Sequence, residues 1–178
     1  MVFLRIVFLT LILLIGVLFT LGYSLFSIIN FKSKLFNAEI FIDNINITFV
    51  EINETINYKY SDLDINSNYK LILSCLYYGC IVTSCFIAAG IIVSYLRMKF
   101  ISKILFIIAQ IFMTTLAAII VFIYYSSSFI KSILPNYTEI TIPEDYNDIN
   151  TSYGTGGLLL IISSLAMIVI YCIYSFIG

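Results

Sequence analysis

The sequence contains no histidine and no tryptophan, and only 11% of its 178 residues are charged. Without histidine, the chain lacks the commonest general base, the commonest metal ligand and the usual pH sensor. Soluble domains carry about 25% charged residues. The low charge, a hydrophobic fraction of 61% and a mean hydropathy of +1.06 therefore exclude a water-soluble globular fold. A basic surface suited to nucleic acid is also missing.

Cysteine is missing from both polar segments of the chain. Cys75, Cys80, Cys85 and Cys172 all lie in apolar runs, which excludes an outer domain held together by disulfides. The first three are spaced five residues apart, so on a helix each is rotated about 140° from the previous one. They share no face that could hold a metal, and the sequence predicts neither a metal site nor a cofactor.

The interiors of the apolar runs also lack Asp, Glu, His, Lys and Arg. All ten acids lie in Glu39–Asp64 and Glu139–Asp148. Intramembrane ionisable residues mark ion-coupled carriers and intramembrane catalysts. No pair of nucleophile and base can be named either, since histidine is absent and no cysteine lies in a polar segment. These absences indicate a protein that is not an enzyme.

Two long apolar runs joined by a short basic turn organise the chain. Leu71–Leu96 and Ile104–Ile130 each exceed the roughly 20 apolar residues that cross a bilayer. The turn between them contains Arg97, Lys99 and Lys103 and no acid. Cations concentrate in cytoplasmic turns, so this pair predicts a membrane hairpin whose turn faces the cytoplasm.

Two further apolar runs complete a predicted membrane domain of four spans over residues 1–178. A signal peptide, with Arg5 as its basic start and a cleavage site near Gly22, is the competing interpretation of the first run. That run is much longer than the 7–15 apolar residues of a signal peptide, which favours a retained helix. The predicted spans cover residues 3–29, 71–96, 104–128 and 155–177, with outer loops at 30–70 and 129–154 and the cytoplasmic turn at 97–103.

Four glycosylation sequons support this orientation, because all of them lie in the predicted outer loops. Lys32 and Lys34, just beyond the first span, oppose it. We therefore expect both termini in the cytoplasm, and a location in the plasma membrane or another secretory-pathway or endolysosomal membrane. The sequon asparagines are Asn46, Asn53, Asn136 and Asn150.

The outer loops show the period-two alternation of half-buried strands. It occurs in Ala38–Asp43, Asn44–Phe49, Ile56–Ser61 and Tyr137–Ile142. The predicted fold is mainly α: a four-transmembrane-helix bundle with a small extracellular antiparallel β-sheet built from both outer loops.

Small and polar residues inside the spans predict helix packing. Small faces let helices approach closely in lipid, and an oligomer face is the alternative use. Gly154–Gly157 lacks the lysine and preceding buried strand of a phosphate-binding loop. The candidate packing residues are Ser84, Ala88, Gly90, Gln110 and Ala117.

The arrangement resembles the claudin and peripheral-myelin-protein superfamily and its fungal four-span relatives. The shared features are four spans, cytoplasmic termini, a long β-prone first outer loop, a short basic inner turn and a shorter second outer loop with one strand. The family's first loop carries Trp, Gly-Leu-Trp and two cysteines, whereas residues 30–70 contain neither Trp nor Cys. The resemblance therefore implies an architecture and transfers no functional residue.

The inert spans and patterned loops favour a structural or interaction protein. We expect a role in adhesion or barrier formation, or as an accessory subunit of a larger membrane complex, with partners bound through the outer loops. The alternative is the protomer of an oligomeric pore. The expected partners are the lipid bilayer, other membrane proteins and further copies of the chain, without nucleic acid.

Overall fold

Four long helices form most of the structure, a computed structural model that describes residues 2–33, 36–50, 54–59, 67–126 and 150–177. All four are long and apolar enough to cross a membrane, as in an integral membrane protein. Their lengths follow from long apolar runs that proline does not interrupt, because a segment in lipid must satisfy its backbone polar groups internally. The helices are α1 (Val2–Leu25), α2 (Ser67–Tyr95), α3 (Lys99–Tyr125) and α5 (Thr155–Ile177).

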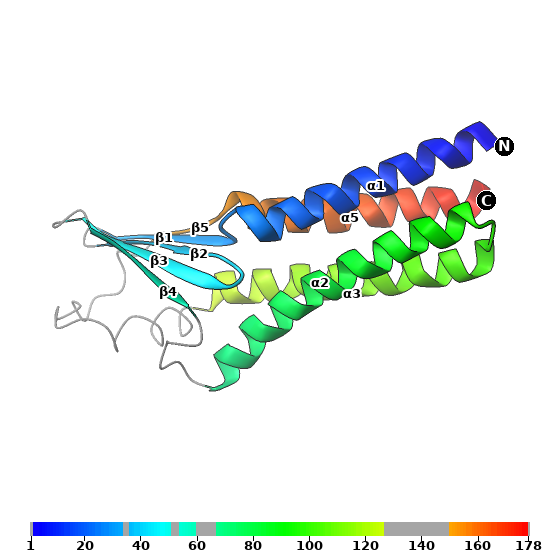
Figure 1. The fold of residues 1–178 in the computed structure, drawn as a ribbon. Coiled ribbons are helices and arrows are strands. Elements are labelled where there is room, and N and C mark those ends of the chain that lie inside the picture. The colour runs from blue at the N-terminus through cyan, green and yellow to red at the C-terminus, as the bar shows by residue number, and fades with distance from the viewer. Residues whose placement is uncertain (1, 34–35, 51–53, 60–66, 127–149, 178) are drawn as a thin grey trace.

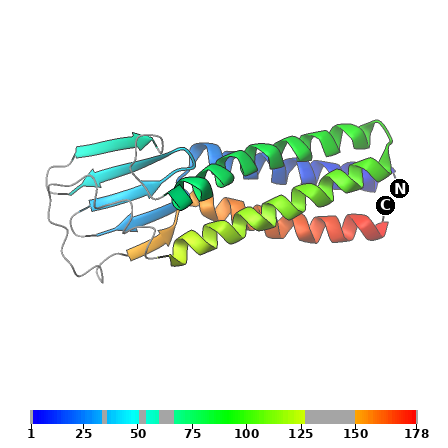
Figure 2. The same cartoon turned by 90° about the horizontal axis from the view of Figure 1, so that it is seen from below.

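A five-stranded antiparallel sheet lies at one end of the bundle (Figures 1 and 2). Its spatial order is β4-β3-β2-β1-β5, so the last strand returns to pair with the first. Both polar segments of the sequence therefore contribute to one sheet, and the predicted fold class is confirmed. The strands are β1 (Ile29–Lys32), β2 (Phe36–Ile40), β3 (Asn44–Phe49), β4 (Glu54–Lys59) and β5 (Asn150–Tyr153).

The helices run antiparallel to their chain neighbours, and both termini lie at the end opposite the sheet (Figure 1). The turn between α2 and α3 lies at that same end. Contacts join α1 to α5, α2 to α3, α3 to α5 and α1 to α2, as expected for a four-helix bundle.

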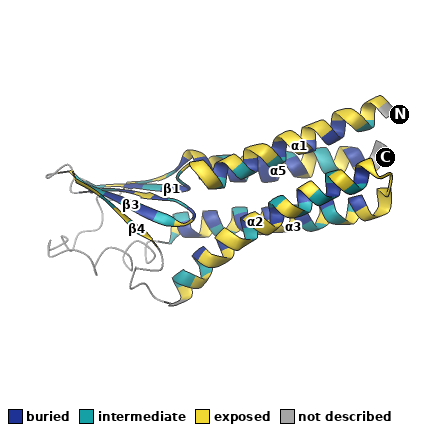
Figure 3. Cartoon of the chain, viewed as in Figure 1, coloured by how far each residue is buried: buried dark blue, intermediate teal, exposed yellow. Residues whose placement is uncertain are grey.

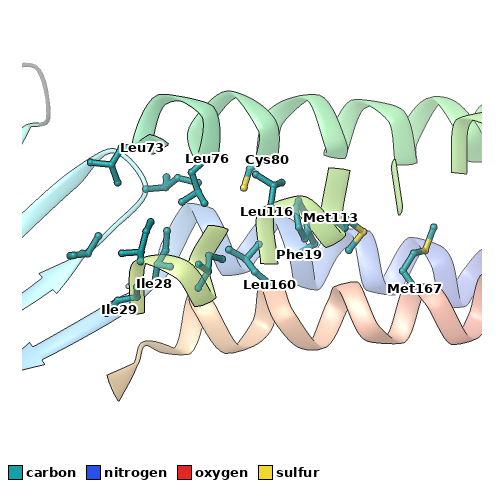
Figure 4. Packing of buried hydrophobic residues seen from close by; sticks show 14 of the residues in the cluster. Phe19, Ile28, Ile29, Leu73, Leu76, Cys80, Met113, Leu116, Leu160 and Met167 are labelled. Atoms are coloured by element: carbon teal, nitrogen blue, oxygen red, sulfur yellow. The ribbon is translucent and has the colours of Figure 1, made fainter. Parts of the chain in front are cut away.

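The core runs continuously from the bundle into the sheet. Phe19 of α1, Met113 of α3 and Leu160 of α5 converge inside the bundle, and Leu73 of α2 lies beside Ile28 at the sheet end (Figure 4). The outer helix faces are exposed and apolar along their length (Figure 3). Such faces are stable only against lipid, which agrees with the membrane assignment.

The boundaries of the elements differ from the expected spans. Helix α1 ends at Leu25 rather than at residue 29, because the backbone beyond it pairs with β2 and β5. The turn between α2 and α3 contains only residues 96–98, and Lys99–Lys103 form the first turns of α3. Hydropathy marks where the membrane begins, whereas lysine is itself a good helix former.

Among the predicted strands, Asn44–Phe49 coincides with β3. Ala38–Asp43 and Ile56–Ser61 each overlap a strand that starts two residues earlier, namely β2 and β4. Tyr137–Ile142 lies outside the described residues. The strand from the second polar segment that the structure does describe is β5, whose register follows from its pairing with β1.

Candidate functional site

The part of the bundle that the structure describes contains no group of residues suited to a metal. Its ionisable side chains lie at the helix ends, apart from cysteines and tyrosines. The most elaborate polar surface of the described chain is instead one face of the sheet. Because side chains alternate between the two faces of a strand, the observed register determines which residues share that face.

The polar side chains of neighbouring strands form rows across the sheet. The central row contains Asn57, Asn46, Glu39, Asn30 and Ser152, one residue from each strand. A second row lies toward the far end of the sheet and contains Thr55, Thr48, Asn37, Lys32 and Asn150. We call the surface made by these two rows, with Asn44 and Lys59, the amide face.

Four asparagines of the amide face have an unsatisfied acceptor. The side-chain carbonyl oxygens of Asn30, Asn37, Asn44 and Asn46 are buried and accept no hydrogen bond from the part of the chain that the structure describes. Buried polar atoms are nearly always paired, and each exception requires an explanation. Thr48 and Thr55, by contrast, pair with each other at 2.9 Å. The amide face thus contains several amide oxygens that have no donor among the described residues.

The opposite face of the sheet is apolar and belongs to the core. It contains Ile29, Phe31, Ala38, Ile40, Ile45 and Ile47, each with at most 6% of its surface exposed. At about 25 cal/mol for each Å² of buried apolar surface, this face fixes the register strongly, because a one-residue slip would exchange the two faces. The polar rows are consequently held in place by the packing behind them.

Aromatic contacts hold the β5 edge of the sheet against α3. The rings of Tyr124 and Tyr153 are stacked, with centroids 4.1 Å apart, and the Tyr124 hydroxyl donates to the carbonyl of Thr151 at 3.3 Å. Partial burial raises the pKa of the Tyr153 phenol, and the neighbouring phenols of Tyr125 and Tyr124 add to the shift. The Tyr153 phenol therefore remains neutral in neutral solution.

The candidate packing residues of α2 lie at different places on that helix. Gly90 is buried, and a Cβ added there would lie 2.6 Å from the Phe106 ring of α3. Ser84 is half-buried, with its hydroxyl oxygen 3.2 Å from that of Thr20 in α1. Ala88 is exposed and lines a groove of about 260 Å³ between α1 and α2.

The candidate packing residues of α3 are both half-buried. The Gln110 amide donates to the Thr114 hydroxyl at 3.0 Å and to the Ser164 carbonyl of α5 at 3.4 Å. Its own carbonyl oxygen is buried and accepts no bond. Ala117 lies about two helical turns after Gln110 in α3. Gln110 thus joins α3 to α5 within the bundle.

The sequon asparagines differ in their surroundings. Asn46 is half-buried in the middle of the amide face, between β4 and β2. Asn150 is exposed at the start of β5, on the sheet edge. Asn53 and Asn136 lie outside the described residues. Of the two that are described, Asn150 is the more accessible acceptor for a glycan.

Sequence reasoning placed Asn44 and Asn46 on a polar strand face, but it missed Asn30 and Asn37. Asn30 begins the predicted outer loop at residue 30, where no strand was predicted, and Asn37 immediately precedes the predicted strand Ala38–Asp43. The signal that could have identified Asn30 is the alternation of apolar and polar residues in Ile29–Lys32, which has the two-residue period of a strand.

Comparison with known proteins finds no family model that matches the chain and no curated protein that is similar to it.

Proposed function

We propose that the chain is a non-enzymatic membrane protein that binds a partner protein through the amide face of its sheet. In this proposal the sheet lies on the outer or luminal side and both termini face the cytoplasm. The biological role is adhesion or barrier formation, or that of an accessory subunit in a larger membrane complex. The observation that carries the proposal is the set of four buried asparagine carbonyls without a donor.

Unpaired acceptors on a rigid face favour a partner that supplies donors. Leaving a buried polar group unpaired costs about 1–3 kcal/mol. A bound surface with hydroxyl, amide or guanidinium groups would remove that cost once the asparagine amides turn outward to meet it. The charged residues of the face, Glu39, Lys32 and Lys59, are of mixed sign. They would orient the partner more than hold it.

The architecture supports a claudin-like interpretation of this role. Four strands come from the first polar segment and one from the second, over four antiparallel helices. The family's tryptophans and cysteines are absent, so the apolar packing of Ile29, Ile40 and Ile45 supports the sheet in their place. The resemblance thus supports a binding scaffold and says nothing about the identity of the partner.

The alternative, an oligomeric pore, requires polar walls between copies. Thr114 and Thr115 are exposed on α3, but each hydroxyl donates to a backbone carbonyl one turn earlier, at 2.9 Å. Such internal pairing leaves a mainly apolar helix surface. The amide face is therefore the better supported contact surface.

A charge reversal on the amide face tests the proposal. Glu39→Arg should abolish photo-crosslinking from a benzophenone side chain placed at Asn57, which is exposed on the same face. Asp43→Arg is the matched control, because Asp43 is equally exposed but lies in the β2–β3 turn. The crosslinked product, identified by mass, should be either a second copy or a different membrane protein.

The opposite pattern would contradict the proposal. If crosslinks form from a benzophenone at Ala88 or Ala117 and persist in Glu39→Arg, while Asn57 gives none in the wild type, then partners bind through the helices.

A further inference from the structure

The bundle end opposite the sheet is basic. It carries Arg5 near the start of α1, Arg97 in the turn, and Lys99 and Lys103 in the first turns of α3 (Figure 1). All ten acids lie in the two polar segments, within Glu39–Asp64 and Glu139–Asp148, and none is close in sequence to these four cations. Within the described residues, no carboxylate lies at this end to neutralise the four cations.

Arg5 has a structural role at this end. Its guanidinium donates to the Ser94 carbonyl, near the end of α2, and to the Ser94 hydroxyl at 3.1 Å. A cation at a helix C-terminus satisfies free carbonyls and complements the helix dipole. The cations left for a ligand are therefore Arg97 and Lys99, which are exposed, and Lys103, which is half-buried.

The backbone at Arg97 is strained in a way that calls for an explanation. The amide of Met98 donates to the carbonyl of Val93, and the amide of Arg97 donates to the carbonyl of Ser94. This is the Schellman closure of a helix, whose left-handed position is usually glycine. Here Arg97 adopts φ 65°. Backbone strain of this kind is concentrated at functional positions, which favours a role for the Arg97 side chain.

Apolar and cationic residues alternate through the same segment. Leu96, Met98 and Phe100 are 65%, 49% and 77% exposed, and Arg97 and Lys99 lie between them. Lys103 follows Lys99 by four residues, so both lie on one face of α3. Helix α3 also begins without a side-chain cap or an acid in its first turn, which adds to the positive potential.

We propose that this segment, Leu96–Lys103, binds the phosphate of an anionic phospholipid. At 27 residues α3 is about 40 Å long, more than the bilayer core of about 30 Å, so its first turns lie at headgroup depth. The exposed apolar side chains would enter the acyl region, and the Arg97 fork would hold the phosphate with Lys99 and Lys103.

The test uses the full chain reconstituted in phosphatidylcholine bilayers with traces of spin-labelled lipid. Electron paramagnetic resonance gives the preference of the protein for phosphatidic acid over phosphatidylcholine. Each cation near an anionic surface raises the affinity about fivefold, so the triple variant Arg97→Gln, Lys99→Gln, Lys103→Gln should bring the two lipids to near-equal binding. The matched control removes three cations at the sheet end, Lys32, Lys59 and Lys70, and should retain the preference.

A single substitution separates binding from folding. Arg97→Gly should keep or raise the melting temperature, because glycine accepts the left-handed backbone, while lowering the preference for phosphatidic acid about fivefold. Soluble glycerol 3-phosphate should compete weakly, since it lacks the acyl chains. An unchanged preference of the triple variant for phosphatidic acid would overturn the proposal of a lipid site. Competition by glycerol 3-phosphate as strong as that by phosphatidic acid would overturn it as well.

Discussion

The junction of α1 and α5 offers the sharpest test of the fold. The amide of Gly154 donates to the carbonyl of Ile28, and the amide of Gly156 donates to that of Ser27, both at 2.9 Å. A Cβ added at Gly156 would lie 2.6 Å from the Phe26 carbonyl oxygen and 2.9 Å from that of Ser27. These neighbours are backbone atoms, so they cannot turn aside as a side chain would.

The magnitude expected for Gly156→Ala follows from three contributions. Overpacking costs about 1–3 kcal/mol, and separating the two segments would weaken two hydrogen bonds worth about 1 kcal/mol each. Alanine gains about 1 kcal/mol in helix propensity. The free energy of unfolding should therefore fall by about 2–4 kcal/mol, which corresponds to a melting temperature about 5–15 °C lower for a chain of this size.

Cys80 provides the assay, because it is buried while the other three cysteines are exposed. In a background with Cys75, Cys85 and Cys172 changed to serine, a thiol-reactive dye reports thermal unfolding in detergent. Gly16→Ala is the matched control. A Cβ there would meet only the Ile87 side chain at 3.0 Å, which can move, so its melting temperature should change little.

Equal melting temperatures for Gly156→Ala and Gly16→Ala would refute this reasoning. That result would mean that α5 does not lie against the backbone of the α1–β1 turn.

Two further outcomes test the sheet and its sidedness. Ile47→Asp should reduce the yield of folded protein strongly, since Ile47 is 2% exposed, whereas Thr48→Asp on the amide face should be tolerated. Similar yields of the two variants in gel filtration would contradict the observed strand register. In a background with Asn53→Gln and Asn136→Gln, Asn150→Gln should abolish a glycosidase-sensitive shift on gels and Asn46→Gln should leave it, because Asn150 is exposed and Asn46 half-buried. A shift that depends on Asn46 would contradict the accessibility argument.

The helices could be predicted from the sequence because lipid imposes a simple requirement. A spanning helix satisfies its backbone internally and needs only enough consecutive apolar residues. The strand Asn44–Phe49 was equally visible, since its apolar residues alternate with polar ones and one face is buried. Both patterns are local, and both were recovered from local information.

The amide face could not be predicted as a unit, because it depends on pairing between distant segments. Asn30 joins Ser152 only through the pairing of β1 with β5. The apolar residues Ile28 and Ile29 continue the hydropathy of α1, so composition alone assigns them to the first span. Their burial in the sheet results from hydrogen bonding to β2, such as Ile28 to Ile40 at 2.6 Å.

The strain at Arg97 was also invisible in the sequence, where Arg97 counted only as one cation of a basic turn. If only the charge mattered, a cation at a neighbouring position would serve equally well, and glycine could occupy the left-handed position 97. The structure shows that the chain keeps arginine where glycine would be more stable. A topological signal needs only a positive charge on the correct side, whereas a fixed guanidinium is needed for a defined anion. The geometry of this turn therefore favours recognition over topology as the reason for arginine at this position.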